Sequence, residues 1–93
     1  MPDIIPFLLR LREATLFTVD RHFYQRTLCH AKYGLVFLAV DQTEAAHYMR
    51  RVLRHPAFDS QAKRLGLVIR ASASHLEAWR LRAAEEERFA WMD

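Results

Sequence analysis

With 93 residues, the chain has enough material for one folded domain, 1–93, and too little for two. Apolar residues make up 52% of it, which argues against a disordered chain, and its single cysteine, Cys29, excludes a secreted scaffold held by internal disulfides. The net charge of +3 rests on twelve arginines and two lysines. This bias fits either a GC-rich genome or selection for bidentate contacts with phosphates and carboxylates.

The amino terminus predicts neither a secretion signal nor a membrane anchor. Asp3 precedes the first arginines, Arg10 and Arg12, which reverses the charge order of a signal peptide. The longest apolar run, 33–40, has about half the length that a membrane-spanning helix needs. We therefore expect a cytoplasmic protein without a membrane partner.

The first part of the chain predicts a helix. Apolar residues dominate 4–12, no helix-breaking residue follows Pro6, and prolines are tolerated in a first helical turn. The helix could continue as far as Cys29. Because 15–19 has the β-branched and aromatic content of a short strand, the state of that stretch stays open.

A strand and a capped helix follow. Residues 34–40 form a continuous apolar run of strand length, rich in β-branched and aromatic side chains. Asp41 and Glu44 then resemble a capping box, which predicts a helix over 42–54 that Pro56 stops.

The same order recurs in the second half. Residues 65–69 are a second apolar run, and Ser74 and Glu77 form a second capping box before a helix over 75–91. The sequence thus predicts an α/β or α+β fold: an N-terminal helix, then a βαβα core with parallel pairing through a right-handed crossover. Two parallel strands make a small sheet, so we expect a third strand from the N-terminal half or from a second copy of the chain.

The helix predicted over 42–54 has one apolar arc and one basic arc at 100° per residue. The apolar arc consists of Ala45, Ala46, Tyr48, Met49, Val52 and Leu53. The basic arc consists of His47, Arg50, Arg51, Arg54 and His55.

The basic arc contains no acidic residue after Glu44, whereas a solvated helix face usually mixes both signs. The dipole at the end of a helix also favours cations. We interpret this face as a binding surface for an anion, either an acidic protein patch or nucleic-acid phosphate. The alternative is a solvated face that acids elsewhere in the chain, such as 85–87, neutralise.

The helix predicted over 75–91 would carry two apolar stripes, although one is enough to dock on a sheet. The second stripe, together with the tryptophan near the C-terminus, predicts a homodimer interface or a groove for another protein. The alternative is a helix embedded more deeply in its own domain. The candidate interface residues are Ala78, Leu81, Phe89, Trp91 and Met92.

A helix-turn-helix-like segment at 58–82 is an alternative for the second half. Ala62 lies four residues before Gly66, as at the turn of many such motifs, and nearby arginines would suit phosphate contacts. However, Ser72 and His75 are polar where a recognition helix needs apolar residues. Only half of the motif is present.

No pattern predicts catalysis, a metal site or a cofactor. His22, Cys29 and His30 do not have zinc-site spacing, and two glycines are too few for a phosphate-cradling loop. Ser74 is explained as a helix cap. We therefore expect a chain that is not an enzyme.

The sequence predicts a non-enzymatic protein-interaction or regulatory module, a homodimer that binds a partner with an acidic surface. Arginines would orient the partner, and Trp79, Phe89 and Trp91 would supply binding free energy. A small inhibitor from a phage or mobile element fits this description. The alternative is a nucleic-acid-binding regulator that uses the same arginines.

Overall fold

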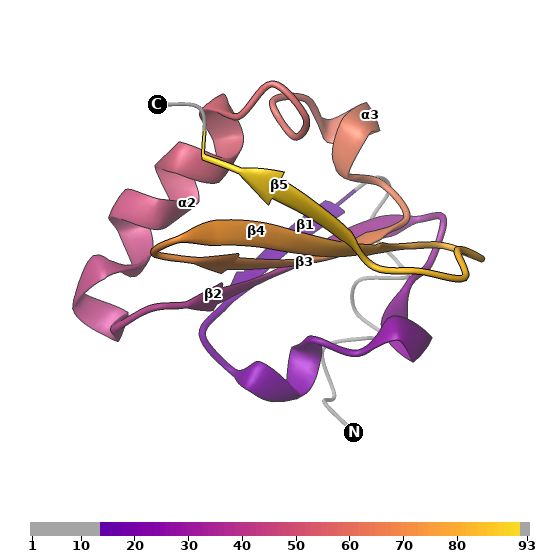
Figure 1. The fold of residues 1–93 in the computed structure, drawn as a ribbon, viewed down its shortest axis with the longest axis horizontal. Coiled ribbons are helices and arrows are strands. Elements are labelled where there is room, and N and C mark those ends of the chain that lie inside the picture. Colours follow the sequence, from indigo (N-terminus) through magenta and orange to yellow (C-terminus); the bar gives the residue numbers. More distant parts are fainter. Residues whose placement is uncertain (1–13, 92–93) are drawn as a thin grey trace.

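The structure is a computed structural model that describes residues 14–91. Five strands form one sheet in the order β1-β2-β3-β4-β5 (Figure 1). The strands are β1 (Ala14–Thr18), β2 (Tyr33–Ala39), β3 (Leu67–Ser72), β4 (His75–Arg80) and β5 (Glu87–Ala90). The β1–β2 and β2–β3 pairs are parallel, and the β3–β4 and β4–β5 pairs are antiparallel.

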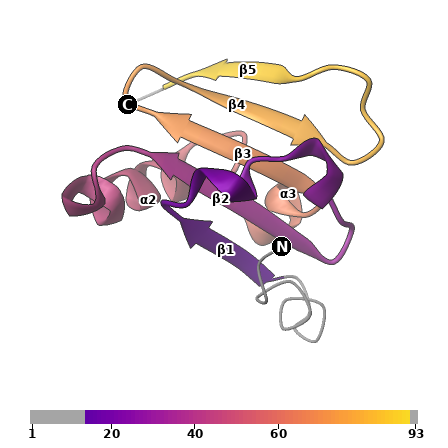
Figure 2. The ribbon, with the colours of Figure 1, turned by 90° about the horizontal axis from the view of Figure 1, so that it is seen from below.

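The two connections between the parallel strands cover opposite faces of the sheet (Figures 1 and 2). The first connection contains the short 3-10 helices η1 (Arg21–Phe23) and η2 (Arg26–Leu28). The second contains η3 (Gln42–Glu44), α2 (Ala45–Arg54) and α3 (Gln61–Arg64). None of these helices is long and apolar enough to cross a membrane, within the part of the chain that the structure describes.

β2 is buried on both faces because each connection packs on one of them. Val36 and Leu38 contact the core under α2, which includes Val52. Tyr33 and Leu35 belong to the core on the other face. A strand that is covered on both faces has apolar residues at consecutive positions, and this explains the continuous apolar run at 34–40.

Several predicted elements are present in the structure. The strand expected at 34–40 is β2, and the helix expected over 42–54 is η3 followed by α2. The Asp41 side chain accepts a hydrogen bond from the Thr43 N–H, as a capping residue does. The stretch at 15–19 belongs mainly to β1, which gives the sheet its third parallel strand.

The predicted fold class, an N-terminal helix before a βαβα core, is wrong. The stretch 75–91 forms β4, a turn and β5 in place of a helix. Leu76 and Ala78 point into the core from alternate positions, and Ser74 lies in the β3–β4 turn and caps no helix. The helix expected at 4–12 lies outside the described residues, and its extension to Cys29 is replaced by β1, η1 and η2.

The alternative for the second half, a helix-turn-helix-like segment at 58–82, is also wrong. α3 is a single turn of helix, and the chain continues from it into β3 and β4. No second helix follows in that segment, so its arginines do not belong to a recognition helix.

Candidate functional site

α2 crosses one face of the sheet, but the sheet covers only part of its apolar arc. Tyr48 and Val52 are buried against the core. Met49 is half-buried, and Ala46 and Leu53 are exposed. Part of the apolar side of α2 therefore does not contact the sheet and faces outward.

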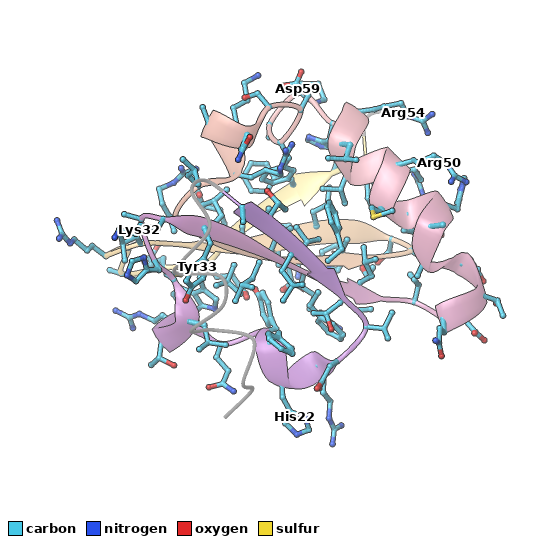
Figure 3. All side chains as sticks on the ribbon, turned by 180° about the vertical axis from the view of Figure 1, so that it is seen from behind. His22, Lys32, Tyr33, Arg50, Arg54 and Asp59 are labelled. Carbon is cyan, nitrogen blue, oxygen red and sulfur yellow. The ribbon has the colours of Figure 1, made fainter. Side chains whose placement is uncertain are left out.

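The outward side of α2 carries the basic ridge, which we define as His47, Arg50 and Arg54. All three side chains are exposed, and they follow one another at spacings of three and four residues, on neighbouring turns of the helix. Figure 3 shows Arg50 and Arg54 pointing away from the body of the protein. Neither arginine forms an ion pair with any carboxylate in residues 14–91.

Arg51 and His55, predicted as members of the same face, serve the packing of the chain. The Arg51 guanidinium lies 4.1 Å from the centre of the Trp91 ring and 5.1 Å from that of Tyr48, in cation–π geometry. His55 is only 6% exposed. Its Nδ1 accepts a hydrogen bond from the Ala57 N–H at 3.1 Å, and its Nε2 donates to the Ala90 carbonyl at 2.8 Å.

The residues predicted as an interface lie mostly in the chain's own packing. Ala78 is fully buried in β4, and Phe89 and Trp91 are half-buried against the helical layer. The Trp91 Nε1 donates to the Ser72 carbonyl at 2.8 Å. Leu81 is half-buried, and Met92 lies outside the described residues. The stripe that grouped these side chains required a helix over 75–91, which does not form.

The α2 groove, a hollow of about 420 Å³, lies beside the basic ridge. It opens between the carboxyl end of β1 and the first half of α2. Its lining residues are Phe17, Thr18, Val19, Leu38, Gln42, Ala45, Ala46 and Met49. Most of them are apolar, and the carboxyl ends of parallel strands are a common position for binding sites.

Sequence reasoning did not find this groove. Phe17 and Leu38 come from two strands and Met49 from a helix, so no linear motif contains them. The one signal available was the width of the apolar arc of 42–54, which extends past Met49 to Leu53 and Ala46.

No family model, curated protein or solved structure matches this chain. Its function is therefore inferred from the ridge and the groove, and from the other polar clusters of the fold.

A polar row on the opposite face of the sheet is the second cluster with potential chemistry. Ser74 Oγ lies 2.8 Å from His75 Nδ1, and His75 Nε2 lies 3.2 Å from Glu77 Oε1. In hydrolases such a row works because the carboxylate stabilises a charged imidazole. Here Arg70 Nη1 holds the same Glu77 oxygen at 2.6 Å, and β3 and β4 pair these two residues directly. We assign the row to cross-strand stabilisation of the hairpin.

This ion pair makes stability depend on pH. Burial raises the pKa of the Glu77 carboxyl, but the hydrogen bond from Arg70 and the neighbouring His75 outweigh it and hold the pKa below its usual value. The folded state therefore gains stability above the pKa of the unfolded carboxyl, about 4.3, and loses it as the pH falls through the lower pKa of the folded state.

We expect Glu77→Gln to lower the free energy of unfolding by about 1 kcal/mol at pH 7, a modest figure because Arg70 is 39% exposed. Glutamine keeps the shape and an acceptor oxygen but loses the charge. In urea titrations the gap between the two proteins should shrink as the pH is lowered from 5 to 2.5. A gap that stays constant over this range would show that the charge of Glu77 does not stabilise the fold.

The other reactive side chains, those of Cys29 and Tyr24, form contacts within the fold. The Cys29 Sγ lies 3.3 Å from the Trp79 carbonyl oxygen, and burial raises the pKa of this thiol, which makes the thiolate less available. The Tyr24 hydroxyl donates to Glu86. Within residues 14–91, no three His, Cys, Asp or Glu side chains come together as a metal site.

Proposed function

We propose that this protein is a non-enzymatic interaction module that binds the acidic surface of a partner protein through the basic ridge of α2. The observation that carries the proposal is the pair Arg50 and Arg54, which are exposed on one helix face and form no ion pair with a carboxylate of residues 14–91.

The charge arrangement of the ridge favours an anion. Arg50 and Arg54 are four residues apart, so they repel each other by a few tenths of a kcal/mol in the free protein. A bound carboxylate relieves this repulsion. The packing of Tyr48 and Val52 fixes the helix on the sheet, so the guanidinium groups project from a rigid element. Such a surface steers an acidic partner and sets its orientation.

A protein partner fits this surface better than a nucleic acid does. The ridge runs from His47 to Arg54, about 10 Å along the helix, which is short compared with the track of cations that several phosphates require. Other cations are already paired within the fold, among them Lys63 with Asp59 and Arg80 with Glu87. The groove beside the ridge is lined mostly by apolar side chains, which do not bind phosphate.

The proposal does not include a homodimer. Of the residues expected to form its interface, Ala78 is buried in the core, and Phe89 and Trp91 are half-buried against it. An interface on the ridge itself would bring two basic helix faces together.

The double variant Arg50→Glu/Arg54→Glu tests this function. In affinity purification from the native host after nuclease treatment, we expect a direct partner whose recovery falls at least tenfold with this variant, because losing two charge contacts costs about 1.5–3 kcal/mol. The free energy of unfolding should stay within about 0.5 kcal/mol of the wild type, since both side chains are exposed.

The double variant Arg21→Glu/Arg82→Glu is the matched control, because it makes the same change in net charge at exposed positions away from α2. It should recover the partner as the wild type does. Equal recovery by all three proteins would contradict the proposed function. A loss of duplex DNA affinity that is specific to the ridge variant, measured by fluorescence anisotropy, would replace the protein partner by nucleic acid.

A further inference from the structure

We infer that the α2 groove binds a large apolar side chain of the same partner, so that the recognised segment is a peptide with an apolar anchor and nearby Asp or Glu residues. This inference rests on the proposed function and names the class of partner.

Within residues 14–91, exposed apolar side chains gather at the groove. Among residues 14–91, the exposed large hydrophobic side chains are Val19, at 42%, and Leu53, at 37%. Val19 lines the groove, and Leu53 lies one turn after Met49, which also lines it. Exposed apolar side chains that gather at one hollow mark a binding surface better than scattered ones do. A volume of about 420 Å³ lies in the usual range of ligand sites.

The groove and the basic ridge share a border. Ala46 lines the groove, and Arg50 lies one turn further along the same side of α2. Around the helix, the side chains follow in the order Met49, Leu53, Ala46, Arg50. An apolar group bound beside Ala46 therefore lies one helical turn from Arg50.

The helix spacing sets the spacing of the partner's residues. Arg50 lies about 6 Å from Ala46 along the helix axis, and Arg54 about 12 Å. An extended peptide advances about 3.3 Å per residue. A peptide lying along α2 with its anchor beside Ala46 would thus place acidic residues about two and four positions from that anchor. Thr18 and Gln42 give the groove polar groups for the peptide backbone.

Charge favours an acidic partner over the two other candidate occupants. Residues 1–13 of this chain are rich in apolar side chains, but their two acids and two arginines give them no net charge to complement the ridge. A second copy of the chain has a net charge of +3 and, in a two-fold contact, would bring its own ridge against this one.

The test is selection of a random 12-residue peptide display library on the full-length protein. We expect enriched peptides with Asp or Glu two to four positions from Trp, Phe, Leu or Met. Synthetic peptides of this class should lose at least tenfold in affinity with Ala46→Trp, which fills the groove, and with Arg50→Gln/Arg54→Gln. Ala62→Trp, at an exposed alanine of α3, is the matched control and should bind as the wild type does.

The outcomes separate the two proposals. If acidic peptides depend on the arginines but bind Ala46→Trp unchanged, the inference about the groove is wrong and the proposed function stands. If no acidic residues are enriched, the inference about the peptide is wrong, and recovery of the partner by Arg50→Glu/Arg54→Glu decides the proposed function. Nuclear Overhauser contacts from the Met49 methyl to residues 4–11 that persist at saturating peptide would assign the groove to the chain's own segment. A dimeric mass that Ala46→Trp converts to a monomeric one would assign it to a second copy.

Discussion

Replacing Gly34 by alanine is expected to destabilise the protein by about 3 kcal/mol. Gly34 is buried in β2, and a Cβ atom added there would lie 2.6 Å from the carbonyl oxygen of Arg64. A clash with backbone cannot be relieved by turning a side chain. Arg64 is also held in place by its side chain, whose Nη1 donates to the Phe58 carbonyl and whose Nε donates to the Thr15 hydroxyl. Urea unfolding followed by circular dichroism measures the loss.

Gly66→Ala is the control for this prediction, because it tests a different requirement for glycine. Gly66 has a φ of 81°, in the left-handed region, but an added Cβ would meet only the Leu81 Cβ, at 3.7 Å. Its cost is therefore the conformational one, about 1 kcal/mol. If Gly34→Ala costs no more than Gly66→Ala, α3 does not lie as close to β2 as described.

The elements that sequence reasoning predicted are those with strong local signals. β2 is an unbroken apolar run, and α2 is bounded by Asp41 before it and Pro56 after it. The local signals of the stretch 75–80 indicate a helix instead, since Leu, Glu, Ala and Arg favour helices and Ser74 and Glu77 have the spacing of a capping box. Its strand conformation depends on pairing with residues of other strands: Glu77 lies opposite Arg70 of β3, and Leu76 lies opposite Phe89 of β5. Tertiary pairing overrides local propensity there.

The same division applies to the candidate site. The basic ridge follows from helical spacing alone, so His47, Arg50 and Arg54 could be predicted together. His55 lies on the same predicted arc, but its ring forms a hydrogen bond with the Ala90 carbonyl of β5, a strand that the sequence did not indicate. The α2 groove combines side chains from β1, β2 and α2, and its shape depends on how those elements pack.

Trp91→Ala is expected to lower the free energy of unfolding by about 2–3 kcal/mol, somewhat less than for a fully buried tryptophan. The Trp91 ring packs on Tyr48 and His55, at 5.9 and 6.2 Å between ring centres, and the Arg51 guanidinium stacks on it. These contacts join the end of β5 to α2. Removing the ring therefore loosens the attachment of the last strand, and chemical denaturation should show it.

Trp91→Phe separates the packing of Trp91 from its hydrogen bond. Phenylalanine keeps an aromatic ring against Tyr48 but loses the Nε1 bond to the Ser72 carbonyl, so we expect a loss of about 1 kcal/mol. A residue that serves as an anchor for a partner behaves differently, because exposed anchors change binding and leave stability within about 0.5 kcal/mol. If both variants keep wild-type stability but lose the partner, Trp91 belongs to the interface. A graded loss of stability places it in the fold and leaves recognition to the face of α2 that carries Arg50 and Arg54.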